Sequence, residues 1–136
     1  ACDNTVVDHQ SVVMSFENGV EASLVMTAFT AGGGRRYTFH GTLGELVLDE
    51  EANTLTLHKY GKEAEVSTLS DLNEKGYGHG GGDVNIMRDV ISYLNGEAPS
   101  ISMTYIDDSV NGHLLVYGAE ESRKTHRIVE IDEYRR

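Results

Sequence analysis

The chain has 136 residues and a formal net charge of -11, and 39% of its residues are apolar. These values predict one soluble domain with a modest core, and they argue against binding to nucleic acid or anionic membranes, which carry the same sign of charge. No apolar run approaches the length of about 20 residues that crosses a bilayer. The lone cysteine, Cys2, cannot form an internal disulfide, which favours a reducing cytoplasm.

The first half of the sequence predicts five or six strands, because β-branched and aromatic residues alternate with polar ones. Asn18-Gly19 predicts a hairpin with a type I′ turn between the first two strands. The expected strand segments are 6–17, 20–30, a third within 32–41, 45–49, 54–60 and 65–69.

Two helices and a last strand are expected in the second half. Apolar residues from Ile86 to Leu94 follow helical spacing, with Asp83 as the expected N-cap and Gly96 as the left-handed residue after the helix. The second helix is expected over 104–125, and the segment 127–134 reads as a closing strand.

Segregated strands and helices indicate an α+β fold. We therefore predict a single domain over 1–136, with one large, mostly antiparallel open sheet and two main helices packed on one face. The opposite face is expected to be half polar and to be wet or covered by a partner. Its predicted residues are Arg36, Thr38, His40, Val47, Thr54, Thr56 and His58.

The glycine-rich stretch GYGHGGGD at 76–83 is the motif most suggestive of a site. No Lys-Ser or Lys-Thr pair follows the glycines, and no apolar strand precedes them, so neither nucleotide-binding fingerprint fits. One reading is architectural, with glycines leading into a helix. The other is that the loop presents Tyr77 and His79 to a substrate. His79 and Asp83 are too few to predict a metal site.

Five segments in order resemble the C-terminal domain of Gfo/Idh/MocA oxidoreductases. They are FENGVEASLVMTAF, RRYTFHGTLGEL, GHGGGDVNIMRDVISYL, DDSVNGHLLVYGAEESR and IVEI. The resemblance implies a substrate-side and oligomerisation domain whose parent enzyme carries an N-terminal Rossmann domain that binds NAD or NADP. It also implies a sugar, inositol or related polyol as substrate, and a homo-oligomer formed through the open sheet face.

The chain lacks the family motifs that bind the cofactor and carry out catalysis. The cofactor fingerprint, the Glu-Lys-Pro motif and the Asp-x-x-x-His pair have no counterpart here. We therefore expect no catalytic, cofactor-binding or metal-binding residue in this chain, and an inactive isolated fragment of a longer protein. His126 stands where the family commonly has a glycine. Two alternatives stay open: a stand-alone, non-enzymatic binding module with the same fold, and part of an NAD-dependent glycosidase.

Overall fold

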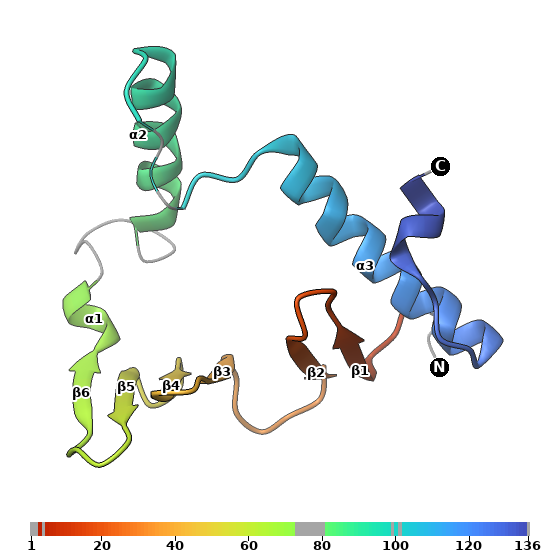
Figure 1. The fold of residues 1–136 in the computed structure, drawn as a ribbon, viewed down its shortest axis with the longest axis horizontal. Helices are drawn as coiled ribbons and strands as arrows, with labels where there is room; N and C mark the ends of the chain where they lie inside the picture. The colour runs from red at the N-terminus through yellow and green to blue at the C-terminus, as the bar shows by residue number, and fades with distance from the viewer. Residues whose placement is uncertain (1–2, 4, 73–80, 99, 101, 136) are drawn as a thin grey trace. The chain divides into compact units, whose positions relative to one another are not determined.

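A computed structural model describes residues 3, 5–72, 81–98, 100 and 102–135 (Figure 1). The described elements are antiparallel strands followed by helices, so the predicted α+β class is confirmed. The chain divides into two compact units. One contains residues 1–28 and 100–136, and the other contains residues 29–99.

Strands β1 (His9–Ser15) and β2 (Glu21–Thr27) form an antiparallel hairpin. Its turn differs from the predicted type I′, because only Gly19 has a positive φ, of 81°. The Gly19 amide donates to the carbonyl of Phe16 (2.8 Å), and the Phe16 amide donates to that of Val20 (2.9 Å). This is a three-residue loop that ends on a left-handed glycine, a common alternative to the two-residue turn.

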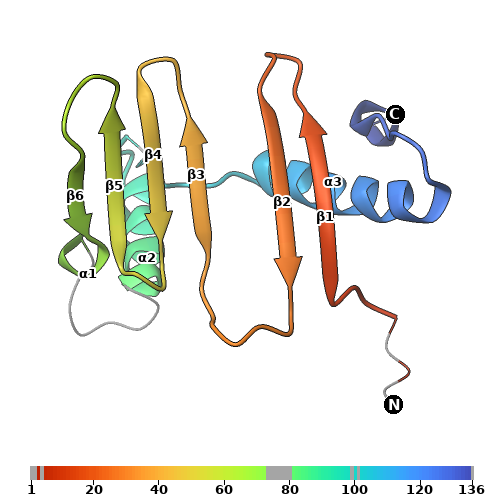
Figure 2. The same cartoon turned by 90° about the horizontal axis from the view of Figure 1, so that it is seen from below.

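Four further strands form a second antiparallel sheet in the order β3-β4-β5-β6, which Figure 2 shows side by side. Their bounds are β3 Arg36–His40, β4 Gly44–Asp49, β5 Thr54–Lys59 and β6 Glu65–Thr68. One face carries the apolar side chains, because cross-strand partners point to the same side of a sheet. The set comprises Tyr37, Phe39, Leu46, Leu48, Leu55 and Leu57.

The prediction of one continuous sheet needs correction, since the described strands form a two-stranded and a four-stranded sheet. The six strand segments predicted in the first half correspond to the observed strands β1 to β6, with β4 beginning one residue before the predicted 45–49. Packing of the two main helices on one sheet face stays a prediction. Among the described residues, no apolar side chain is fully buried.

A short helix, α1 (Leu69–Leu72), follows β6 directly. Asn53, in the left-handed conformation with φ 57°, connects this helix to the β4–β5 turn. Its carbonyl accepts from the Leu69 amide (3.0 Å), and its side-chain oxygen accepts from the Ser70 amide (3.1 Å). One asparagine thus satisfies two of the amide groups that a helix start leaves without partners.

Helix α2 spans Gly82–Leu94 and carries the predicted apolar stripe. Its N-cap is Gly81, with φ 88°, so the predicted cap Asp83 lies inside the first turn, where its charge favours the helix dipole. The C-terminal prediction is confirmed. Gly96 is left-handed (φ 79°) and donates to the Tyr93 carbonyl, while Glu97 donates to that of Ser92. These two bonds define a Schellman motif.

Helix α3 spans Ile106–Thr125, and the Asp108 carboxylate accepts from the Tyr105 amide (3.1 Å) at its start. The expected final strand over 127–134 is wrong: a 3-10 helix, η2 (Ile131–Arg135), ends the described chain. Helical spacing accounts for the difference, because Ile131 and Tyr134 stand three apart and are both half-buried. Among the described residues, no helix is both long and apolar enough to cross a membrane.

Gly118 lets the chain after α3 pack back onto that helix. It is the buried residue of α3, and a Cβ placed there would lie 2.5 Å from the Ile131 Cδ1 methyl. The Arg135 guanidinium reaches Asn111 (2.9 Å), and the Tyr134 hydroxyl donates to the Glu121 carboxylate. The end of the chain is therefore held along one face of α3.

Candidate functional site

Tyr77 and His79, the predicted substrate contacts, lie outside the described residues. The described part of that motif begins with Gly81 and Gly82, which start α2. Asp83 follows in the first helical turn. Gly81 and Gly82 thus form the N-terminal start of α2, as the architectural interpretation predicts. The proposed function of the histidine and tyrosine stays a prediction.

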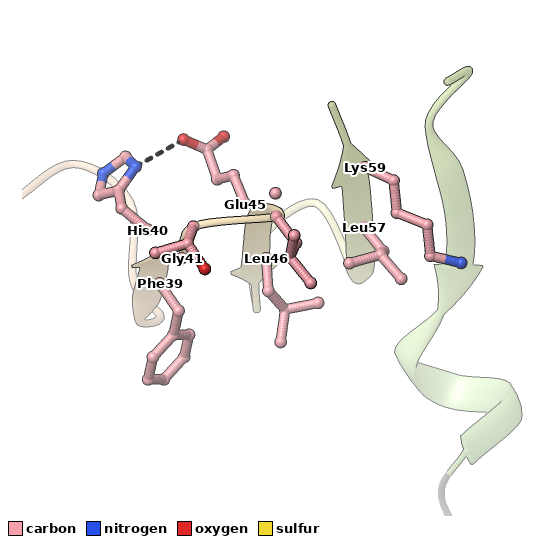
Figure 3. Close-up of a pocket in the computed structure, with 10 residues that line it drawn as sticks. Phe39, His40, Gly41, Glu45, Leu46, Leu57 and Lys59 are labelled. Atoms are coloured by element: carbon pink, nitrogen blue, oxygen red, sulfur yellow. Dashed lines mark ion pairs between the residues drawn. The ribbon is translucent and has the colours of Figure 1, made fainter. Parts of the chain in front are cut away.

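An open hollow of about 480 Å³ lies where β3 turns into β4 (Figure 3). Phe39, Leu46 and Leu57 supply its apolar wall from three neighbouring strands. Gly44 contributes no side chain to the hollow. A Cβ at this position would stand 2.2 Å from the His58 carbonyl oxygen, so the close approach of the two strands requires glycine here. The full lining is Phe39, His40, Gly41, Thr42, Leu43, Gly44, Glu45, Leu46, Leu57 and Lys59.

The polar side chains that line the hollow have close partners. The Lys59 ammonium lies 2.7 Å from the Glu65 carboxylate, and His40 Nδ1 lies 2.9 Å from Glu45 Oε2. In Figure 3 the His40 and Glu45 side chains point away from the side on which Phe39 and Leu46 lie. The hollow therefore has an apolar wall, with the Lys59–Glu65 and His40–Glu45 pairs at its margin.

The half-polar sheet face predicted from the sequence is confirmed by the strand register. Residues directly opposite each other share a face. Three cross-strand rows follow: Arg36, Asp49 and Thr54; Thr38, Val47 and Thr56; His40, Glu45 and His58. All seven predicted residues lie on this face, which we call the polar face.

Acidic side chains lie beside arginine or histidine in the outer rows of the polar face. Arg36 Nε lies 3.9 Å from Asp49 Oδ2 in one row, and Glu45 has a histidine on each neighbouring strand in the other. Threonine and valine fill the row between them. Within the described part of the chain, no three histidine, cysteine or acidic side chains are placed to hold a metal ion.

Polar groups also gather along α3 and η2, where sequence reasoning placed a strand. The pKa of the Tyr134 phenol is raised above its usual range, chiefly by its hydrogen bond to the Glu121 carboxylate. A hollow of about 360 Å³ nearby is lined by Asp107, Val110, Asn111, Leu114 and Arg135. The spacing of Ile131 and Tyr134 was the signal that predicts a helical turn here.

Comparison with known proteins found no matching family model, and no curated protein or solved structure with significant similarity. The resemblance to the oxidoreductase domain therefore rests on the five sequence segments alone.

Proposed function

We propose that this chain is the substrate-side and oligomerisation domain of a two-domain, NAD(P)-dependent oxidoreductase that acts on a sugar, an inositol or a related polyol. One observation carries the proposal. Four of the five resembling segments fall, in the family's order, on discrete elements: β2 with the turn before it, the β3–β4 pair, α2 and α3. His126, at the family's glycine position, is left-handed with φ 55°.

The departure is the fifth segment, IVEI, which runs into η2 instead of forming a strand. The proposal depends on the four segments before it.

In this proposal the two domains of the enzyme have different functions. A cytoplasmic Rossmann domain supplies the dinucleotide and the acid/base group, and the cofactor accepts or gives the hydride. This chain forms a wall of the substrate pocket, and Tyr77 and His79 contact the substrate hydroxyls. It contributes no catalytic residue.

Titration of the isolated chain with NAD and NADP tests whether the dinucleotide binds only to the other domain. We expect no heat of binding at millimolar dinucleotide, because the phosphate-cradling glycine turn belongs to the other domain. Saturable binding would contradict the assignment. The reading frame upstream of the Ala1 codon is expected to encode a GxGxxG motif and a Glu-Lys-Pro motif.

Replacement of His79 in the two-domain parent tests whether this chain contacts the substrate. His79→Ala is expected to lower kcat/KM about tenfold, which corresponds to a loss of about 1.4 kcal/mol of transition-state binding, with the cofactor affinity unchanged. His113→Ala is the matched control, because His113 bonds within α3 to the Ser109 carbonyl. An unaltered kcat/KM for His79→Ala would make the loop purely architectural.

Self-association through the polar face is the remaining part of the proposal. Thr56 lies in the middle row of that face, so Thr56→Arg places a long cation at its centre. We expect this change to shift sedimentation from oligomer towards monomer. Thr42→Arg makes the same exchange at the exposed β3–β4 turn and is expected to leave the oligomer intact. Equal behaviour of the two variants, or a monomeric parent chain, would refute this interface.

A further inference from the structure

The chain contains three Asn-Gly dipeptides, at Asn18, Asn95 and Asn111, and all three lie among the described residues. Such a pair can react with itself. The backbone nitrogen of the glycine attacks the side-chain carbonyl carbon of the asparagine, and the absent Cβ of glycine leaves that approach open. Whether the reaction proceeds in a folded protein depends on how firmly the local backbone is held.

Asn18 stands at the tip of the β1–β2 hairpin, in the centre of the turn. Its side-chain oxygen accepts a hydrogen bond from the Val20 amide at 3.1 Å. That oxygen is the atom that gains negative charge when the glycine nitrogen adds to the carbonyl carbon. A donor already aimed at it stabilises the developing charge.

The free energy needed to open the turn around Asn18 is also low. The Gly19 amide is held by one bond to the Phe16 carbonyl, and the asparagine is exposed. Rotation of this peptide into the attacking position therefore breaks contacts at the hairpin tip, which belongs to the least protected class of backbone. The strand ladder on either side does not have to separate.

The other two pairs are held more firmly. Asn111 and Gly112 lie inside the 20-residue helix α3, where the backbone is held by the helical hydrogen bonds. Asn95 and Gly96 form the end of α2, where both amides donate to helix carbonyls. Turning either peptide requires part of a helix to unwind.

We propose that Asn18 is a site of spontaneous deamidation in the folded protein. A bond forms between the Gly19 nitrogen and the Asn18 Cγ, the bond from Cγ to the amide nitrogen breaks, and ammonia leaves with the transferred proton. The resulting succinimide is opened by one water molecule, giving either aspartate or isoaspartate. No oxidant or cofactor takes part.

The products change the hairpin in two ways. Either product adds a negative charge to a turn that already lies between Glu17 and Glu21. Isoaspartate also inserts a methylene into the backbone, directly beside the terminal pair of the ladder, Ser15 and Glu21. The register of the two strands depends on the length of this turn.

Peptide mapping by mass spectrometry after incubation of the whole chain at mildly alkaline pH tests the proposal. In the folded chain, the peptide containing Asn18 is expected to convert at least about tenfold faster than the peptide containing Asn111, as its lower opening cost requires. In denaturant, the three sites are expected to convert at similar rates. Conversion of Asn18 no faster than Asn111 in the folded chain would overturn the proposal.

Two variants complete the test. Asn18→Gln lengthens the side chain and is expected to abolish both the acidic shift on ion exchange and methyl transfer by an isoaspartate methyltransferase. Asn111→Gln is the matched control and is expected to leave both signals in place. An acidic shift that persists in Asn18→Gln but disappears in Asn111→Gln would assign the reactive site to α3 and contradict the proposal.

Discussion

His126 is the residue at which α3 stops. It adopts φ 55° and ψ 38°, and its amide donates to the Ser122 carbonyl at 2.8 Å. An L-residue in this region brings its Cβ close to the following carbonyl, at a cost of about 1–2 kcal/mol. Glycine has no such cost, which is why it usually occupies this position after a helix.

His126→Gly is therefore expected to raise the free energy of unfolding by about 0.5 kcal/mol, because the relief of strain exceeds the entropy that glycine gives to the unfolded chain, about 0.4–1 kcal/mol. Urea unfolding measures the difference. His126→Ala retains a Cβ and serves as the control, with no gain expected. A glycine variant no more stable than the alanine variant would show that the strain at this position is smaller than the entropy that glycine gives to the unfolded chain.

Glu120 forms ion pairs with two cations of its own helix, Arg123 at 2.8 Å and Lys124 at 3.0 Å. The hydrogen bond from Arg123, then that from Lys124, lowers the pKa of its carboxyl group from 4.5 to about 2. A carboxyl whose pKa is lower in the folded chain stabilises that chain above its unfolded pKa, and the contribution disappears as the pH falls through the folded pKa.

Glu120→Gln is therefore expected to reduce stability at neutral pH, and the difference from the parent chain is expected to shrink between pH 4.5 and about 2. Because the pair is exposed, the effect is expected to be small. Urea midpoints over a pH series measure it. Glu63→Gln in the β5–β6 turn controls for the loss of one charge. A constant difference down to the lowest pH would contradict the ion-pair explanation.

At the scale of elements, α3 contains two glycines in different surroundings. No atom lies within 4 Å of a Cβ built at Gly112, whereas at Gly118 such an atom meets the Ile131 Cδ1 methyl at 2.5 Å. Alanine is favoured over glycine inside a helix by about 1 kcal/mol. The comparison of these two positions therefore isolates the contact between α3 and η2.

Gly112→Ala is expected to stabilise the chain by about 1 kcal/mol. Gly118→Ala is expected to yield no net gain, because displacing the Ile131 methyl costs about 1 kcal/mol of overpacking. Thermal or urea unfolding of both variants gives the measurement. Equal gains at the two positions would mean that η2 does not pack on α3 in solution.

The elements also show where sequence patterns predict and where they fail. Alternation located each strand, and the shared face of Arg36, Thr38 and His40 followed from the period of two. The segment 127–134 was misread, because Ile128 and Val129 resemble a strand while the spacing of Ile131 and Tyr134 is that of a 3-10 turn. The local pattern of 127–134 therefore fits both structures, and the packing of Ile131 against Gly118, which lies outside this segment, decides between them.

The same limit applies to the candidate site. The histidine on the glycine loop could be named from residue type alone, but Tyr77 and His79 lie outside the described residues. The hollow beside Gly44 was not predicted, since its wall combines Phe39, Leu46 and Leu57 from three strands. Concave surfaces depend on cross-strand register, which a linear pattern specifies only in part.

At the scale of the whole molecule, a net charge of -11 on each copy opposes association. Raising the salt concentration from about 0.01 M to about 0.15 M shortens the screening length from about 30 Å to about 8 Å. We expect the oligomer proposed above to gain population over this range, as seen by sedimentation. Dissociation on adding salt would instead indicate that the paired charges of the polar face dominate the interface.

The compact unit that contains the amino-terminal hairpin is built from the two ends of the chain, with residues 29–99 grouped apart from it. Residues 29–99 are thus one uninterrupted stretch of chain, and this unit can form without either end of the sequence. The other unit is complete only when both ends of the chain have been made, because it contains residues 1–28 and 100–136.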